Sequence, residues 1–227
     1  MKIENCELKI NFMNLVILGP QGSGKGTQAE MLAQKFSLEH IDMGKFLREV
    51  AKQDTPLGKE IYHYQNVINE MVPSKILREV LHVKIASIPR EQGVIFEGVP
   101  RTMDQAGYFD EAILESGRKI NAVIDIQLSE KESVKRISKR RICEKCKTVY
   151  ILEKDINNGE NCPSCNGKII QRLDDTDEGI KKRLQVFNEE TLPVIEHYRK
   201  KGNLVEINGD QSIEKVFEEV IGKLENI

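Results

Sequence analysis

The sequence predicts an α/β protein in which a parallel sheet of five strands lies between layers of helices. Short apolar segments alternate with amphipathic segments along the chain, which is the order of strand and helix that a parallel sheet requires. The apolar segments are continuous runs, as in strands buried on both faces. We therefore expect strands at Leu15–Leu18, Leu38–Ile41, Val94–Phe96, Ala122–Leu128 and Leu204–Ile207.

The helices of this pattern follow recognisable start signals. Ser129 and Glu132 have the spacing of a capping box, in which the two side chains bind free backbone N–H groups at the start of a helix. From Ser212 onward, apolar residues recur every three or four positions, which predicts one buried helical face. We expect helices to begin near Lys25, Ser74, Thr102, Ser129, Thr176 and Ser212.

Composition narrows the class of protein. The 227 residues carry 34 Lys and Arg against 36 Asp and Glu, a formal net charge of −2, and 39% of them are hydrophobic. A chain of this kind forms a hydrophobic core and is neither disordered nor a membrane protein. Its near-neutral charge argues against nucleic acid as a partner. With no visible secretory signal and no apolar run longer than Leu15–Leu18, we expect a cytoplasmic location and no membrane association.

A glycine-rich loop, Gly19–Thr27, joins the first predicted strand to the first helix. Glycines let successive backbone N–H groups turn inward around phosphate oxygens, and the helix start adds partial positive charge. Lys25 would add a full charge, and Thr27 a hydroxyl for phosphate or Mg²⁺. The alternative is a turn that binds nothing, but strand, loop, lysine and helix occur in the required order. The sequence therefore predicts a P-loop three-layer fold that binds a nucleotide.

Four cysteines form two C-x₂-C pairs, Cys143 with Cys146 and Cys162 with Cys165, separated by fifteen residues. Two such pairs can surround a tetrahedral Zn²⁺, and four protein ligands leave no open position for catalysis. We expect a structural zinc site that supplies folding energy to a segment with few apolar residues. Fe(II) or another soft metal, two disulfides, or free thiols are the alternatives.

Phosphoryl transfer requires clustered cations, because the migrating group and its flanks carry several negative charges. Arginine suits this task because its guanidinium binds two oxygens at once. Six arginines lie in segments that resemble motifs: Arg48, Arg101, Arg136, Arg140, Arg172 and Arg183.

The motifs occur in one order along the chain: Gly19–Thr27, Gly44 to Arg48, Gly98 to Gln105, Arg136 to Arg141, the two cysteine pairs, Arg172 to Asp175, Arg183 and Ile207 to Gly209. With this series the chain from about Met13 to Leu224 resembles the adenylate kinase family, in its long form with a zinc-binding lid. The resemblance implies reversible transfer of the terminal phosphoryl group of Mg-ATP to AMP, giving two ADP. It also implies Mg²⁺ with ATP, a structural Zn²⁺, nucleotides as the only partners, and a monomer.

The resemblance also implies a division of the chain. A P-loop core would comprise residues 13–41, 73–138 and 176–227. Residues 42–72 would form a helical lobe that binds the nucleoside monophosphate, and residues 139–175 the zinc-binding lid. Residues 1–12 would be an extension before the core.

The site residues follow from the same resemblance. Catalysis would rest on Lys25, Arg101, Arg140, Arg172 and Arg183. ATP would contact Gly22, Ser23, Gly24, Lys25, Gly26, Thr27, Arg136, Arg140, Val149, Tyr150 and Gln211. AMP would contact Met43, Arg48, Glu70, Met71, Val72, Gly98, Val99, Pro100, Arg101, Gln105, Arg172 and Arg183. Asp174 and Asp175 would belong to the lid hinge and the site.

The chain departs from the family pattern at two places. Met43 and Lys45 replace a Thr and an Asp of the usual motif, while Glu97 and Val99 replace an Asp and a Phe. Glu97 keeps a negative charge near Mg²⁺, whereas Lys45 reverses one. These changes leave two alternatives: a related kinase with another acceptor, and a nucleotide-binding regulator with impaired catalysis. A nucleic-acid zinc ribbon is disfavoured, because no aromatic residues interleave with the cysteine pairs.

Overall fold

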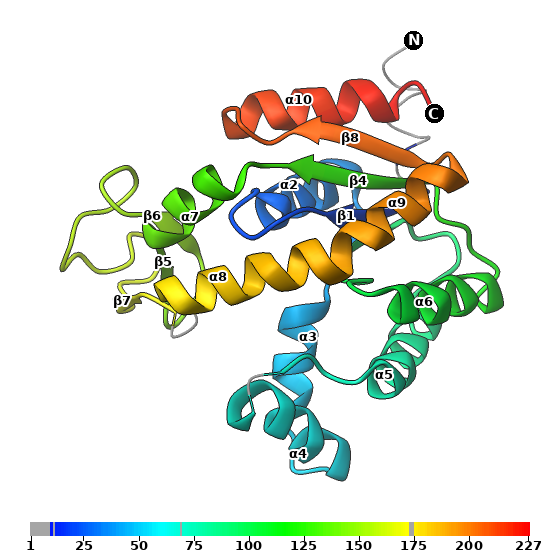
Figure 1. The fold of residues 1–227 in the computed structure, drawn as a ribbon, viewed down its shortest axis with the longest axis horizontal. Coiled ribbons are helices and arrows are strands. Elements are labelled where there is room, and N and C mark those ends of the chain that lie inside the picture. Colours follow the sequence, from blue (N-terminus) through cyan, green and yellow to red (C-terminus); the bar gives the residue numbers. More distant parts are fainter. Residues whose placement is uncertain (1–9, 11, 69, 173–174) are drawn as a thin grey trace.

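The computed structural model describes residues 10, 12–68, 70–172 and 175–227. At its centre is a sheet in which all neighbouring strands are parallel, as predicted (Figure 1). The strand order is β2-β3-β1-β4-β8, so the first strand of the chain is the middle one. The five strands are β1 (Asn14–Leu18), β2 (Glu39–Asp42), β3 (Val94–Glu97), β4 (Ala122–Gln127) and β8 (Leu204–Asn208).

Helices cover both faces of this sheet, which confirms the three-layer architecture. Leu15 and Ile17 of β1 pack into one hydrophobic cluster with α2 (Lys25–Phe36) and α10 (Ile213–Leu224). Val16 and Leu18, which alternate with them, belong to a second cluster on the other face. The helices that cover this face with residues of the second cluster include α5 (Ser74–Ala86), α6 (Met103–Glu115) and α9 (Leu192–Lys201).

The predicted helix starts are confirmed, and their capping explains them. The hydroxyls of Thr102, Ser129, Thr176 and Ser212 each accept a hydrogen bond from the N–H three residues further on. These four residues precede α6, α7 (Glu130–Ser138), α8 (Asp177–Val186) and α10. The first helix, α2, begins at Lys25, directly after Gly24 in the left-handed conformation (φ 89°).

The helix that begins after Thr176 contains a feature that the sequence analysis did not predict. Between α8 and α9 lies a π-helical turn, η2 (Phe187–Thr191), in which the N–H of Leu192 bonds to the carbonyl of Phe187, five residues earlier. Pro193 follows at the start of α9 and has no N–H to continue the regular pattern. The three elements therefore form one long, irregular helix.

Two segments leave the sheet and its covering helices (Figure 1). The first contains α3 (Met43–Val50), α4 (Pro56–Tyr62) and a π-helix, η1 (His63–Val67), so the predicted helical character of residues 42–72 is confirmed. The second forms an antiparallel sheet beside α7 and α8, in the order β6-β5-β7. Its strands are β5 (Arg140–Cys143), β6 (Val149–Ile151) and β7 (Ile169–Ile170).

The start of the chain contributes at least one residue to the core. Ile10 is buried and belongs to the cluster under α2 and α10, whereas residues 1–9 and 11 lie outside the described residues. None of the helices in the described part of the chain has the length and apolar character that crossing a membrane requires.

Candidate functional site

The glycine-rich loop lies at the carboxyl end of β1, where it leads into α2. A side chain at Gly19 would place its Cβ 2.6 Å from the carbonyl oxygen of Ile126 on the neighbouring strand, so only glycine fits there. Gly22 and Gly24 have φ angles of +80° and +89°, which L-residues rarely adopt. The loop therefore has the backbone geometry that its sequence predicted, with Gly24 immediately before the helix.

A buried serine supports this loop from the side. Ser133 of α7 is fully buried, and its hydroxyl donates a hydrogen bond to the carbonyl of Gln21. A Cβ at Gly22 would lie 3.2 Å from the Ser133 carbonyl oxygen, so α7 packs directly against the loop. The sequence analysis missed Ser133, because one serine on a helix carries no signal of a contact 112 residues away.

Lys25 is half-buried, and its Nζ donates to the carbonyl of Pro20 at 3.2 Å. Desolvation, together with repulsion from Arg101, Arg140 and Arg183, lowers the pKa of Lys25 to about 8, while Glu97 acts in the opposite direction. The ammonium group therefore lies close enough to interact with three of the predicted arginines. An anion bound here would relieve both the repulsion and the desolvation.

Glu97 is the carboxylate at the centre of this cationic region. It is the last residue of β3, and a Cβ at Gly26 would lie 3.0 Å from its Oε1, so the carboxylate lies against the start of α2. Its Oε2 is 3.1 Å from Nε2 of His40 on β2. An oxygen ligand beside the phosphate loop suits a hard cation such as Mg²⁺. Glu97 therefore lies beside the phosphate loop, with its carboxylate toward the start of α2.

Asp175 joins two predicted arginines. It is 2% exposed, and its carboxylate accepts bonds from Nε and a terminal nitrogen of Arg140 at 2.8 and 2.5 Å. A terminal nitrogen of Arg183 donates to the same carboxylate at 2.7 Å. Arg140 comes from β5 and Arg183 from α8, so one buried carboxylate orients guanidinium groups from two elements. Asp174, predicted beside it, lies outside the described residues.

Arg101 is accessible to solvent. Its Nε donates to the carbonyl of Gly98 at 2.9 Å. Desolvation lowers the pKa of the Arg101 guanidinium; the carboxylates of Asp42 and Glu97 oppose this, and the charges of Arg48 and Arg172 add to it. Arg48 and Arg172 therefore lie near Arg101. Because Arg101, Arg140 and Arg183 lie near Lys25, five of the six predicted arginines gather around Lys25 and Arg101.

The side chains predicted to contact AMP differ in their exposure. Met43, Val72 and Val99 are 1%, 7% and 0% exposed and pack in the hydrophobic cluster beneath α5 and α6. Glu70 and Met71 are exposed. The segment thus offers a base its backbone and these two side chains, while Met43 and Val99 fill the core. Pro100 is buried and follows a cis peptide bond.

Gln105 and Lys45 each have a defined local role. Gln105 is 6% exposed, and its Oε1 accepts the N–H of Arg101 at 2.8 Å. Lys45 is exposed on α3, and its N–H bonds to the carboxylate of Asp42, the residue that caps that helix, at 2.9 Å. Asp42 therefore places a negative charge at the start of α3, next to the acceptor-side arginines.

The remaining residues predicted for the ATP side lie on several elements. Arg136 is 3.3 Å from Glu132 and 3.5 Å from Asp210. Gln211 donates to the carbonyl of Asn208 at 2.9 Å and to the carboxylate of Glu219 at 2.7 Å. Val149 is 54% exposed on β6, and Thr27 is exposed on α2. Ser23 is 2% exposed, and its Oγ has no hydrogen-bond partner within the described residues.

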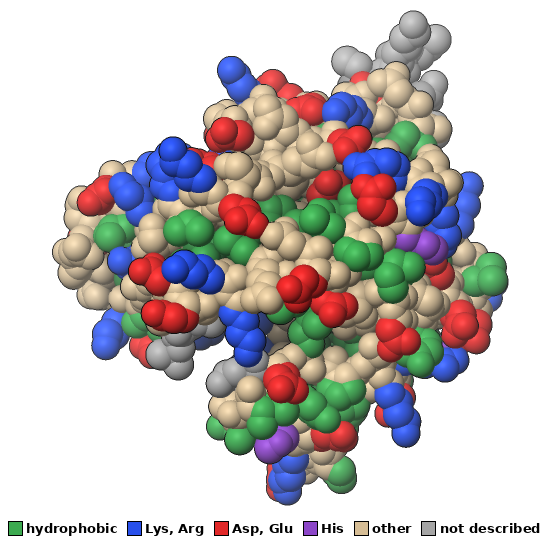
Figure 2. Space-filling model, in the orientation of Figure 1, with side chains coloured by type: hydrophobic (Ala, Val, Ile, Leu, Met, Phe, Trp, Pro, Cys, Tyr) green, Lys and Arg blue, Asp and Glu red, His purple; other side chains and the backbone are tan. Residues whose placement is uncertain are grey.

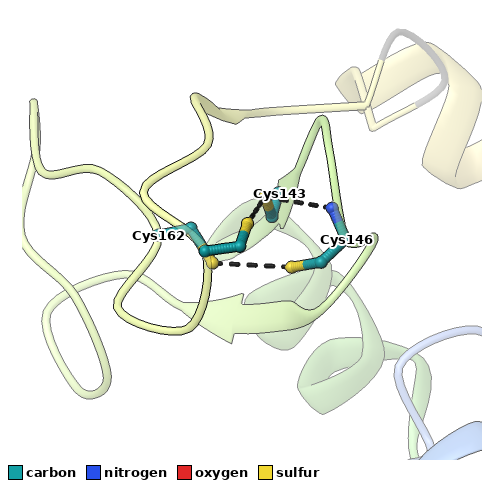
Figure 3. Close-up of side chains that lie close together, drawn as sticks. Cys143, Cys146 and Cys162 are labelled. Atoms are coloured by element: carbon teal, nitrogen blue, oxygen red, sulfur yellow. Dashed lines mark hydrogen bonds between the residues drawn. The ribbon is translucent and has the colours of Figure 1, made fainter.

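The four cysteines meet at one point in the small sheet. All four Sγ atoms lie within 4.8 Å of one another. Figure 3 shows Cys143, Cys146 and Cys162 directed toward each other, with 3.5 Å between Sγ of Cys146 and Sγ of Cys162. Because a disulfide bond is about 2.05 Å long, these are free thiols, spaced as the ligands of a tetrahedral metal are. The structure therefore favours a metal site over the disulfide alternative.

Tyr150, predicted on the ATP side, packs in the cysteine cluster. It is 8% exposed, and its hydroxyl lies 3.0 Å from Sγ of Cys162 and 3.2 Å from Oγ of Ser164. A hydroxyl directed at a ligand atom would support a bound metal from outside its ligand set.

The surface carries both charges intermixed. On the face drawn in Figure 2, acidic and basic side chains alternate over the whole molecule without an extended region of one sign. The cationic residues described above are thus a local concentration around the loop, within a chain of net charge −2.

A phosphate loop on a parallel sheet, with a lysine and arginines gathered round it, defines a P-loop phosphotransferase. Comparison with known proteins agrees with this class. The family model described as adenylate kinase matches residues 17–203. An adenylate kinase of Archaeoglobus fulgidus is 38% identical over 216 residues, which are 95% of this chain and 99% of that protein.

Two further relatives cover the chain to a similar extent. An adenylate kinase of Syntrophomonas wolfei is 35% identical over 95% of this chain and all of its own length. One from Methanothrix thermoacetophila is 38% identical over 92% of this chain and 96% of its own. The chain therefore belongs to the adenylate kinase family. Membership supports ATP:AMP phosphoryl transfer, and it does not favour an acceptor other than AMP or a regulator without catalysis.

Proposed function

We propose that this protein transfers the terminal phosphoryl group of Mg-ATP reversibly to AMP, giving two ADP. The observation that carries the proposal is the convergence of charged groups on the phosphate loop. Lys25 interacts with Arg101, Arg140 and Arg183, and Glu97 lies against the start of α2. Such a group of cations matches a transition state that bridges two nucleotides through their phosphates.

The residues act by position and charge, with no covalent intermediate on the protein. The loop N–H groups and Lys25 would hold the donor phosphates, while Arg48, Arg101 and Arg172 would hold the acceptor phosphate. Arg140 and Arg183, fixed by Asp175, would neutralise the charge of the migrating group. An oxygen of the acceptor phosphate would then attack the terminal phosphorus of ATP in line with the leaving oxygen.

Two metals complete this proposal. Glu97 would hold Mg²⁺ through its hydration shell; when bound, the metal neutralises phosphate charge. Cys143, Cys146, Cys162 and Cys165 would hold a structural Zn²⁺, for which their common spacing within 4.8 Å is suited. A closed set of four thiolates leaves the zinc no part in the reaction.

We further propose a division of labour along the chain, with residues 42–72 as the acceptor lobe and residues 139–175 as a lid. The support is topological. Residues 42–72 follow the carboxyl end of β2, and residues 139–175 connect α8 to α7, the helix that packs against the phosphate loop. Each segment brings arginines toward Lys25 or Arg101. Their closure over bound nucleotides would exclude water, which would otherwise accept the phosphoryl group. We expect the protein to act in the cytoplasm as a monomer, because every proposed site residue comes from one chain.

A coupled assay for ADP with ATP and each nucleoside monophosphate in turn tests the proposal. We expect Mg²⁺-dependent turnover with AMP and at least tenfold lower kcat/KM with UMP, CMP or GMP. Preference for another acceptor would move the protein to a sister activity. Binding of ATP with no turnover of any acceptor would overturn the proposal.

A further inference from the structure

Thr191, the last residue of the π-helical turn η2, is a buried hydroxyl that none of the functions above uses. It is 6% exposed, and its Oγ1 donates to the carbonyl of Arg101 at 3.0 Å, across 90 residues of sequence. A threonine within a helix usually bonds to a carbonyl one turn earlier in the same helix. Here the hydroxyl reaches instead to the backbone of an arginine in the cationic cluster.

The helix is built so that this bond can form. Phe187 lies four residues before Thr191, and its carbonyl already accepts the N–H of Leu192 in the π-helical pattern. Pro193 prevents the regular pattern from resuming at once. π-helical turns are uncommon and occur often at functional sites. The irregular turn therefore leaves the Thr191 hydroxyl free to bond outside its own helix.

The backbone of Arg101 is held from two directions. Its N–H donates to Oε1 of Gln105 at 2.8 Å, and its carbonyl accepts from Thr191 at 3.0 Å. Both partners are 6% exposed, so these bonds are shielded from competing water. The first partner belongs to α6 and the second to the long helix that also carries Arg183.

We propose that Thr191 is a positioning residue for phosphoryl transfer, which sets the place of Arg101 relative to the helix that bears Arg183. The inference rests on the proposed function, because Arg101 is there assigned to the acceptor phosphate. Thr191 touches no nucleotide itself. Loss of its hydroxyl would let the Arg101 backbone shift and would leave the carbonyl of Arg101 without this partner.

Thr191→Val removes the hydroxyl at constant shape, and Thr191→Ser retains it. We expect Thr191→Val to lower kcat/KM for AMP about tenfold, the loss that one buried hydrogen bond gives. KM for ATP should stay within about twofold, and Thr191→Ser should recover most of the AMP-dependent rate. If the valine variant does not fold, Thr191→Ala gives the same comparison without added bulk.

Tyr198→Phe provides a matched control. Tyr198 lies on α9, is fully buried, and donates to Asp110 of α6 at 3.1 Å, so its hydroxyl joins the same two helices away from Arg101. The Tyr198→Phe variant should lower the melting temperature as Thr191→Val does, and it should leave the kinetics with AMP unchanged. Unchanged AMP kinetics in Thr191→Val, equal losses toward ATP and AMP, or an equal AMP defect in Tyr198→Phe would each overturn the inference.

Failure of the proposed function gives a different result. In that case the wild-type protein turns over no acceptor. The affinity for AMP alone, measured by calorimetry, then tests Thr191: about tenfold weaker binding in Thr191→Val supports the positioning role, and equal binding overturns it.

Discussion

The sheet with its covering helices and the cysteine-rich segment are stabilised in different ways. The first has hydrophobic clusters on both faces, formed by most of the large apolar side chains. The second has one small cluster, in which Tyr150 and Ile156 accompany buried cysteines. A segment with so little apolar surface does not stabilise itself by burial. We therefore expect that the proposed nucleotide-binding residues can be changed in the first region without unfolding it, whereas the second would depend on a bound metal.

The largest effect expected concerns Lys25, which tests the first half of this contrast. Lys25→Met should lower kcat/KM about 10³-fold, because the donor phosphates lose their nearest full charge. Melting temperature should hold or rise, since burial already lowers the pKa of Lys25 to about 8 and its charge is held at a cost. Steady-state rates measure the change in kcat/KM, and calorimetry measures the change in melting temperature. Lys200→Met, at an exposed lysine of α9, is the control; a fall in melting temperature for Lys25→Met alone would break the contrast.

Metal removal tests the second half. Chelation, or Cys143→Ser, should release the four cysteines and unfold the small sheet around them. Hydrogen exchange should become fast from about residue 140 to 170 and stay slow in β1 and β4. Activity should fall at least tenfold, because Arg140 is in β5. Cys6→Ser is the matched control. Identical melting and exchange in protein with no metal by elemental analysis would contradict the account.

Asp175 connects the two regions, and its replacement should have an intermediate effect. Asp175→Asn leaves Arg140 and Arg183 without their shared buried partner, which should cost about 3 kcal/mol in the free energy of unfolding. We also expect kcat to fall about tenfold, because both guanidinium groups lose their orientation. Asp177→Asn, at an exposed carboxylate in the first turn of α8, should change stability by less than about 1 kcal/mol. Equal effects of Asp175→Asn and Asp177→Asn would show that the bonds from Asp175 to Arg140 and Arg183 matter neither for stability nor for activity.

Most of the fold follows from local sequence signals. Each predicted strand and helix start is present, because continuous apolar runs and hydroxyl caps act over a few residues. The cysteine pairs also carry their own geometry in their spacing. Side-chain directions were harder to predict: Met43, Val72 and Val99, which the resemblance assigns to AMP contacts, are buried in the core. Their family positions are known, but the directions of their side chains depend on packing with distant helices.

The supporting residues escaped prediction for a related reason. Ser133, Thr191 and the bidentate role of Asp175 depend on contacts between segments far apart in the chain. A single serine or threonine in a helical pattern is ordinarily a solvated or locally bonded residue. The π-helical turn likewise has no local signature beyond Pro193. Sequence thus identifies the charged groups of such a site more readily than the neutral ones that hold them.

The smallest effect on activity is expected in the core itself. Asp125 of β4 is 5% exposed, and desolvation raises its pKa to about 6. A raised pKa means that the charged form is disfavoured in the folded state. The contribution of Asp125 to stability is therefore fully present below its usual pKa of about 4 and is lost as pH rises through about 6.

Asp125→Asn should remove this dependence. The variant and the wild type should have similar stability at pH 4, and the variant should gain up to about 3 kcal/mol at pH 8. Denaturant unfolding across this range measures the difference. Asp177→Asn serves again as the control, and a constant difference between pH 4 and pH 8 would show that Asp125 does not titrate in this window.

The central claim is that the cationic cluster passes a phosphoryl group from one nucleotide to another and not to water. ATP labelled in its terminal phosphate, incubated with AMP, Mg²⁺ and the full-length protein, tests this directly. The account predicts that the label appears in the β-phosphate of ADP, at a rate that depends on AMP and is lost in Lys25→Met. Label released as inorganic phosphate at the same rate with and without AMP, or retained in ATP, would contradict it.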